Sequence, residues 1–223
     1  MELLFDTANL AELAELTPIY PITGVTTNPS IIKAEGRVDF YAHCRAIREI
    51  IGPDRRLHIQ VLAGDADGMV ADAHRILERV DTDVYVKIPT TEPGILAMRR
   101  LVAEGLHVTA TAIYSKTQGI LAIAAGARYL APYFNRMESL DVDTVATIRT
   151  LATLIERHGT DCTILAASFR NVAQISAALE AGADAVTVTP SLLRAALSSP
   201  DVTAAVAAFG QDWYDTFGTT TLP

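Results

Sequence analysis

Short apolar segments alternate with longer amphipathic segments along the whole chain. Eight of the short segments are rich in β-branched and aliphatic residues without clear polar–apolar alternation, a pattern typical of strands buried on both faces of a parallel sheet. They cover residues 3–6, 24–28, 58–62, 84–88, 107–113, 129–134, 163–168 and 185–189. The pattern therefore predicts eight buried parallel strands.

The segments between these strands carry apolar residues three and four positions apart, which is the period of an amphipathic helix. The spacing is clearest over residues 40–51, over 69–80 and from residue 95 onward. Three of the predicted helices end near a glycine, at Gly105, Gly126 and Gly182. We expect each of these glycines to adopt the left-handed backbone conformation that ends a helix and leads into the next strand.

Eight strands alternating with helices in 223 residues predict one (β/α)8 TIM barrel, because such barrels begin at about 200 residues. An open doubly wound sheet is the alternative, but it more often carries a glycine-rich loop after its first strand, and residues 5–9 contain no glycine. The barrel is expected to fill residues 1–200. Residues 201–223 are expected to form an extra C-terminal helix, whose apolar stripe around Trp213 packs on the barrel or on a neighbouring subunit.

Composition excludes several classes of partner. The net charge is −8 and no long basic run occurs, which argues against binding to nucleic acid or to an anionic membrane surface. The first residues do not resemble a signal peptide, and no apolar stretch approaches the ~20 residues needed to cross a bilayer. The two cysteines lie far apart and form no C-x-x-C motif, so we expect buried thiols in a cytoplasmic protein.

Lysine is rare: only Lys33, Lys87 and Lys116 occur among 18 basic residues. Lys87 stands inside an apolar predicted strand, where desolvation favours the neutral amine. A neutral amine can condense with a ketone to form a Schiff base. Two simpler interpretations are an ion pair with Asp6 and an amine that extends to solvent at the strand end.

Other polar residues follow the predicted strands, and the carboxyl ends of barrel strands form the active site in such folds. Asp6 is either an N-cap of the next helix or a carboxylate beside Lys87. Tyr133 fits a core tyrosine as well as a functional one, whereas Gln60 needs hydrogen-bond partners inside an apolar strand. The full set of these polar residues is Asp6, Thr26, Asn28, Gln60, Lys87, Thr111, Tyr133 and Ser168.

An anion site is predicted at the seventh strand. Ser168 opens a strand-to-helix junction, where backbone N–H groups and Arg170 can bind an anion, and Arg136 can add a second guanidinium. Solvated surface is the alternative for both arginines. The five histidines have no metal-ligand spacing and are interpreted as structural.

Taken together, these motifs resemble the transaldolase family, and within it the fructose-6-phosphate aldolase branch. The matching segments follow one another over nearly the whole chain: residues 5–9, 24–30, 86–89, 111–114, 131–133 and 166–170. The Thr-Thr-Asn-Pro-Ser and Lys-Ile-Pro sequences are the most specific of them. The resemblance implies a (β/α)8 barrel whose Schiff-base lysine, Lys87, lies on the fourth strand, with no metal and no organic cofactor.

The resemblance also implies roles for the other residues. Dihydroxyacetone becomes an enamine on Lys87, with Asp6 and Asn28 holding its hydroxyl groups, and adds to an aldehyde such as glyceraldehyde 3-phosphate to form fructose 6-phosphate. Transaldolases typically have Glu and Phe where this chain has Gln60 and Tyr133. In the aldolase branch the phenol takes part in proton transfer, and Gln60 and Thr111 position a water.

Two other functions stay open. One is a short-type transaldolase, because residues 168–171 match the transaldolase phosphate site closely. The other is a non-catalytic barrel that binds a sugar phosphate. The resemblance further implies a ring-like homo-oligomer, a decamer in the aldolase branch, with the C-terminal helix as a contact surface.

Overall fold

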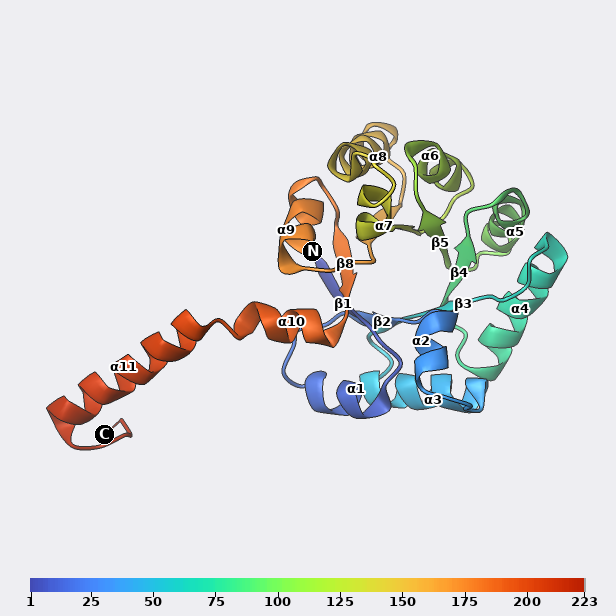
Figure 1. The fold of residues 1–223 in the computed structure, drawn as a ribbon. Coiled ribbons are helices and arrows are strands. Elements are labelled where there is room, and N and C mark those ends of the chain that lie inside the picture. Colours follow the sequence, from blue (N-terminus) through green and yellow to red (C-terminus); the bar gives the residue numbers. More distant parts are fainter. Residues whose placement is uncertain (223) are drawn as a thin grey trace.

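The computed structural model describes residues 1–222 and contains a closed barrel of eight parallel strands in sequential order. Helices surround this barrel (Figure 1). The strands are β1 (Glu2–Asp6), β2 (Gly24–Thr26), β3 (Arg56–Gln60), β4 (Tyr85–Pro89), β5 (Val108–Ile113), β6 (Tyr129–Pro132), β7 (Thr163–Ala166) and β8 (Ala185–Val188). The predicted (β/α)8 barrel is confirmed, and the open doubly wound sheet is not formed.

Helices form in the segments predicted from apolar spacing, 40–51, 69–80 and from residue 95 onward, together with further segments between the strands. They are α1 (Leu10–Leu16), α2 (Pro29–Ala34), α3 (Phe40–Ile51), α4 (Ala66–Arg79), α5 (Glu92–Ala103), α6 (Lys116–Ala124), α7 (Phe134–Glu138), α8 (Thr144–His158), α9 (Val172–Glu180), α10 (Pro190–Leu197) and α11 (Pro200–Phe217). In α3, Cys44, Ile47 and Ile51 form the buried face. Gly105, Gly126 and Gly182 have φ values of +79°, +85° and +105°, as expected for residues that end a helix.

Two separate apolar regions stabilise the fold. The larger one lies between the strands and the helices and includes Val86 and Ile88 of β4. The smaller one fills the interior of the barrel, because side chains along a strand alternate between its two faces. It consists of Leu4, Tyr85, Tyr129, Leu165 and Ala185. Leu165 itself lines the cavity described below, and each of the other four residues lies two positions before a residue that lines it. The interior core is therefore the floor of that cavity.

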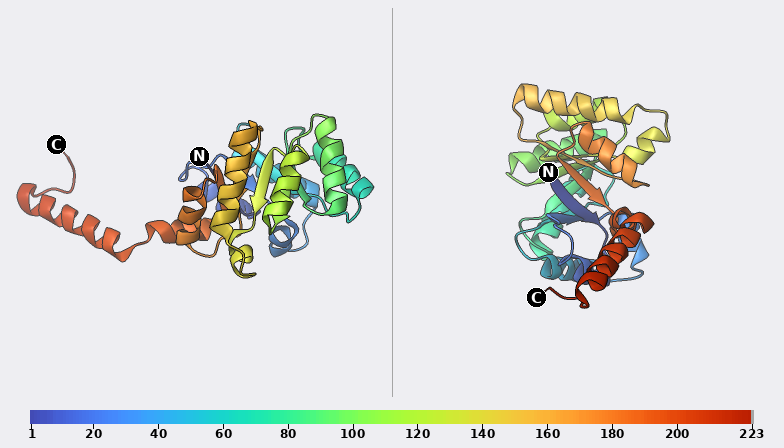
Figure 2. Two further views of the ribbon diagram at one scale, coloured as in Figure 1. Left: turned by 90° about the horizontal axis from the view of Figure 1, so that it is seen from above. Right: turned by 90° about the vertical axis from the view of Figure 1, so that its left-hand side faces the viewer.

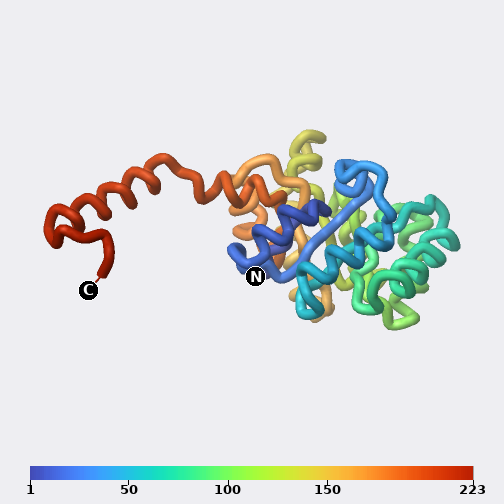
Figure 3. Tube along the Cα trace, turned by 90° about the horizontal axis from the view of Figure 1, so that it is seen from below, coloured from blue at the N-terminus to red at the C-terminus, as the bar shows by residue number. Residues whose placement is uncertain are grey.

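The C-terminal helix α11 does not pack on the barrel. It extends away from the barrel beyond α10 (Figures 1 and 3), and the side view in Figure 2 shows the same separation. Its apolar residues Val202, Val206 and Phe209 are more than half exposed. The extra helix is therefore present, but the expected contact with its own barrel is not formed. Within residues 1–222, every helix is too short or too polar to span a membrane.

Candidate active site

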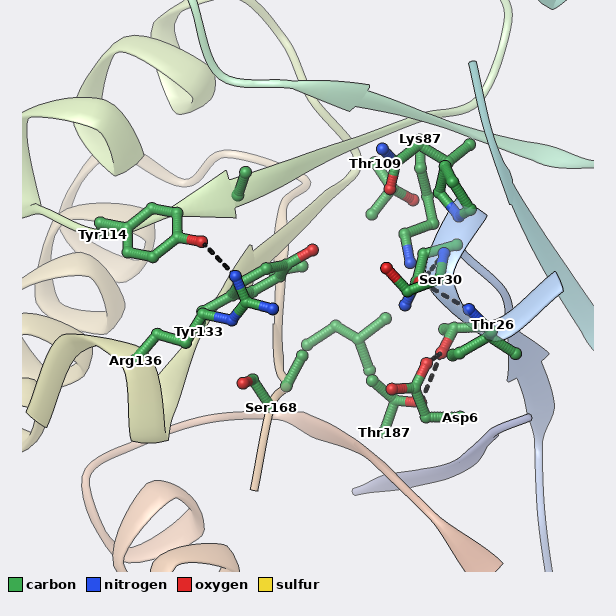
Figure 4. A pocket seen from close by; sticks show the side chains of 18 of the residues that line it. Asp6, Thr26, Ser30, Lys87, Thr109, Tyr114, Tyr133, Arg136, Ser168 and Thr187 are labelled. Carbon is green, nitrogen blue, oxygen red and sulfur yellow. Dashed lines mark hydrogen bonds between the residues drawn. The ribbon is translucent and has the colours of Figure 1, made fainter. Parts of the chain in front are cut away.

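A cavity of about 550 Å³ opens at the carboxyl ends of the strands (Figure 4). Most of its polar lining comes from residues at or just after strand ends. Its lining residues include Asp6, Thr26, Asn28, Ser30, Gln60, Lys87, Thr109, Tyr114, Tyr133, Arg136, Ser168 and Thr187. The structure thus brings together, in one cavity, polar residues that are up to 181 positions apart in the sequence from Asp6 to Thr187.

Lys87 lies in the cavity wall with only 4% of its surface exposed. Its Nζ atom donates a hydrogen bond of 2.7 Å to the backbone carbonyl of Thr27. Burial lowers the pKa of Lys87 because the ammonium form loses its hydration, and the charge of Asp6 opposes this shift in part. The amine does not extend to solvent, and its environment favours the neutral, nucleophilic form.

Asp6 faces the cavity and does not cap the following helix. The N-cap of α1 is Asn9, whose side chain accepts a hydrogen bond from the backbone N–H of Glu12. The carboxylate of Asp6 instead accepts a 2.6 Å hydrogen bond from Thr26 Oγ1, which also lies 2.7 Å from Thr187 Oγ1. Burial raises the pKa of Asp6, whereas the nearby Lys87 charge and the Thr26 hydrogen bond lower it.

Tyr133 and Thr111 form a hydrogen-bonded pair, with 3.1 Å between the phenol oxygen and Thr111 Oγ1. The phenol end of Tyr133 points into the cavity toward Lys87 (Figure 4). Burial raises the pKa of Tyr133, and the negative charge of Asp6 adds to this effect, against the hydrogen bond from Thr111. The phenol therefore keeps its proton near neutral pH and can act as a proton donor.

Gln60 and Asn28 approach Lys87 from the two preceding strands. Gln60 is the direct register partner of Lys87 in the barrel, and its side chain lines the cavity. Asn28 is both an N-cap and a cavity residue: its side-chain oxygen accepts hydrogen bonds from the backbone N–H groups of Ser30 and Ile31. This oxygen is committed to helix α2, so the side-chain NH2 group of Asn28 is what remains for a ligand.

The two arginines of the predicted anion site have different positions. Arg136 lines the cavity, donates a 3.2 Å hydrogen bond to the phenol oxygen of Tyr114, and lies 5.5 Å from the ring centre of Tyr133. Arg170 is exposed and is not part of the cavity lining, although Ser168 is. The cavity lining therefore includes Arg136 and does not include Arg170.

Sequence patterns did not identify Thr109, Tyr114, Ser30 or a role for Thr187. Alternation along the strands contains part of this signal, because Thr187 lies two positions after Ala185, a residue of the interior core. Ser168 and Ala112 adopt φ values of +65° and +56°, both in the left-handed region. Such backbone strain concentrates at functional sites, and both residues line the cavity.

The arrangement is suited to covalent chemistry on a carbonyl compound. A buried amine with a lowered pKa, a protonated phenol and a carboxyl group share one cavity, and an exposed guanidinium is part of its lining. Within residues 1–222, no three His, Cys, Asp or Glu side chains gather closely enough to bind a metal ion.

Comparison with known proteins agrees with this geometry. A family described as Transaldolase/Fructose-6-phosphate aldolase matches residues 3–219 of the chain. A protein from Streptococcus pneumoniae (strain ATCC 700669 / Spain 23F-1), named a probable fructose-6-phosphate aldolase, is 46% identical over 214 residues. That alignment covers 96% of this chain and 96% of the pneumococcal protein.

Proposed function

The chain belongs to the transaldolase/fructose-6-phosphate aldolase family, and we propose that it is a Schiff-base aldolase that makes or cleaves fructose 6-phosphate. Its other substrates are dihydroxyacetone and glyceraldehyde 3-phosphate. The observation that carries the proposal is Lys87, a buried amine whose lowered pKa favours the nucleophilic form, in a cavity shared with Asp6 and Tyr133. A barrel that only binds sugar phosphates would not need this amine.

In the cleavage direction, Lys87 Nζ attacks the C2 carbonyl of fructose 6-phosphate. The carbinolamine loses water and becomes a protonated imine. The proton of the C4 hydroxyl then passes through a water to the carboxylate of Asp6, whose pKa burial raises. The C3–C4 bond breaks at the same time, and its electron pair forms an enamine with the imine as the acceptor. Glyceraldehyde 3-phosphate departs, C3 of the enamine takes up a proton, and water hydrolyses the imine to release dihydroxyacetone and free Lys87.

Tyr133 donates the proton that C3 takes up in this scheme, and the proton held by Asp6 returns to the phenol oxygen through the water. Its phenol keeps its proton and faces the cavity, which suits a donor to C3 of the enamine. Thr111 holds the phenol at 3.1 Å, and Gln60 lies beside Lys87 in the register, so these two residues are suited to position a bridging water. The NH2 group of Asn28 and the carboxylate of Asp6 bind substrate hydroxyl groups.

Arg136 and Ser168 bind the phosphate of the aldehyde. Arg136 is the cavity residue with a permanent charge of the required sign, and its guanidinium is partly hydrated at the rim. A phosphate placed there keeps the reacting aldehyde carbon toward Lys87. Arg170 is exposed and lies outside the cavity lining, so this contact does not require it.

We further propose that the active form is a homo-oligomer in which α11 packs on a second copy of the chain. Val202, Val206, Phe209 and Phe217 are exposed by 55%, 64%, 69% and 60%, on a helix that stands clear of its own barrel. An exposed apolar stripe of this length is typical of a protein interface. A second copy fits because the same arm is present on every copy and can be exchanged reciprocally.

One assay tests the proposed reaction. Incubation with fructose 6-phosphate in the absence of an acceptor aldehyde is expected to release free dihydroxyacetone. Borohydride added during turnover is expected to add a three-carbon mass to the peptide that contains Lys87. If product forms only when erythrose 4-phosphate is present, the enzyme is a transaldolase instead. If neither product nor a trapped adduct forms, the barrel is a binding protein.

A further inference from the structure

His58 is a histidine with no exposed surface inside the barrel, between the interior core and the cavity. It lies on β3 two residues before Gln60 and therefore faces the same interior. Its ring stacks on Tyr85 at 4.9 Å between centroids and meets Tyr129 edge to face at 5.0 Å. Burial holds the pKa of His58 well below 6.5, and the positive charges of Lys87 and Arg56 add to this effect, so the imidazole is neutral.

The hydrogen bonds of His58 identify which ring nitrogen carries its one proton. Nδ1 lies 2.9 Å from Thr109 Oγ1, whereas Nε2 is buried without a hydrogen-bond partner among residues 1–222. A proton on Nε2 would leave an unpaired buried N–H donor. A proton on Nδ1 is donated to Thr109 instead, which satisfies the donor and leaves a bare lone pair on Nε2.

This assignment leaves the hydroxyl hydrogen of Thr109 available. Thr109 lies on β5 opposite Lys87 in the strand register, and its side chain lines the cavity. Figure 4 shows it on the same side of the cavity as Lys87. Its Oγ1 accepts from His58 and has no second side-chain or backbone partner in the part of the chain that the structure describes. Thr109 has no exposed surface, so a ketone at Lys87 reaches this hydroxyl only when the cavity wall beside Thr109 moves.

We propose that His58 is a positioning residue that orients the Thr109 hydroxyl as a hydrogen-bond donor to a hydroxyl oxygen of the ketone bound at Lys87. The inference rests on the proposed function, because it requires a ketone at Lys87. It assigns Thr109 to substrate binding and makes the pair a determinant of specificity. Ketones with a hydroxyl group beside the carbonyl gain this contact, and acetone does not.

The test measures imine formation at Lys87 directly. Borohydride trapping over a range of ketone concentrations, read by intact mass, gives an apparent affinity for dihydroxyacetone and for acetone. Thr109→Val and His58→Phe are each expected to weaken dihydroxyacetone by about tenfold, the loss of one hydrogen bond to a buried group, and to leave acetone unchanged. Thr109→Ser keeps the hydroxyl and is expected to restore the preference.

Two further variants separate positioning from a general structural effect. The double variant of His58→Phe and Thr109→Val is expected to lose no more than Thr109→Val alone, because both changes remove the same contact. Thr147→Val is a matched control. Thr147, in helix α8, is also fully buried, but its hydroxyl donates to the backbone carbonyl of Asp143. This variant is expected to keep the ketone preference of the parent.

Each outcome has a separate meaning. Equal weakening of both ketones, additive losses in the double variant, or an unchanged preference in Thr109→Val would overturn the positioning role. In all three cases the parent protein is still labelled at Lys87, so the proposed function stands. If the parent itself is not labelled at Lys87 by any ketone, the proposed function fails and this inference fails with it.

Discussion

Burial lowers the pKa of Lys87 and raises the pKa of Asp6, and each group partly offsets the effect on the other through its opposite charge. The two residues therefore form one electrostatic unit in the cavity. The nucleophilicity of the amine depends on whether the carboxylate beside it is charged.

Asp6→Asn is expected to lower the pKa of Lys87 further, because the substitution removes the charge that raises it. The measurement is the rate of borohydride trapping at Lys87 as a function of pH. The midpoint of this profile is expected below 10.5, the ordinary pKa of lysine, in the parent and lower still in the variant. A midpoint that stays in place or rises would show that Asp6 does not act on Lys87.

Lys87→Met is expected to abolish turnover and imine trapping while the barrel stays folded, since the substitution replaces a buried amine with an apolar chain of similar length. Loss of turnover is measured by dihydroxyacetone release and the fold by circular dichroism. Lys116→Met is the matched control, because Lys116 is exposed, and it is expected to retain activity. Residual trapping in Lys87→Met would place the Schiff base on another lysine.

The same Lys87→Met variant is expected to change how stability depends on pH. Without the lysine charge, the pKa of Asp6 rises further above 3.8, the ordinary value of an aspartate. Between 3.8 and that raised pKa the folded chain binds more protons than the unfolded chain, so the free energy of unfolding falls as pH rises through this window. Urea unfolding measures this trend, and adding Asp6→Asn is expected to remove it.

Tyr133→Phe is expected to reduce release of dihydroxyacetone by about 10²-fold or more, the usual size of a general acid contribution. Trapping at Lys87 is expected to persist, because imine formation does not use the phenol in this scheme. Transfer to erythrose 4-phosphate is expected to become measurable once the enamine lives longer. Thr111→Val keeps the phenol but removes its 3.1 Å partner, so a smaller loss is expected. Unchanged cleavage in Tyr133→Phe would contradict the assigned role.

Arg136→Ala is expected to raise the KM for glyceraldehyde 3-phosphate by about tenfold or more, the value of a charged hydrogen bond, and to leave the KM for unphosphorylated glyceraldehyde nearly unchanged. Arg170→Ala is the matched control, since Arg170 lies outside the cavity lining. Synthesis assays with the two aldehydes give the comparison. The opposite ranking of the two variants would move the phosphate site to β7.

Phe209→Glu in α11 is expected to reduce the molecular mass of the assembly in solution, because a charge enters the middle of an exposed apolar stripe. Light scattering after size-exclusion chromatography measures the mass. Asp212→Glu, on the same helix, preserves charge and exposure and is expected to leave the assembly intact. A monomeric parent would exclude the proposed contact.

The strand and helix pattern could be predicted from the sequence because it depends on local spacing. Lys87 was recognisable for the same reason, as a lysine within an apolar strand. The separation of Arg136 from Arg170 was not predictable, because it depends on α7, a helix of five residues that starts directly after β6. Phe134, expected at the end of the sixth strand, is instead the first residue of that helix.

Contacts across the barrel were also beyond local patterns. His58 and Thr109 are 51 residues apart, and nothing near His58 in the sequence distinguishes it from a structural histidine. Asn28 was expected to hold a substrate hydroxyl group, and the structure shows that it lines the cavity and also caps α2. The left-handed conformation of Ser168 has no glycine to indicate it.

The apolar layer around Tyr85 and Tyr129 closes the barrel beneath Lys87, so the cavity has no opening at this end. In the proposed reaction both substrates pass through the same entrance, because the ketone binds at Lys87 in the depth of the cavity and the phosphorylated aldehyde binds beside the exposed Arg136. The substrate that binds second must therefore leave first. In cleavage the aldehyde must leave the cavity before the three-carbon ketone can leave. In synthesis an aldehyde that binds first prevents the ketone from reaching Lys87.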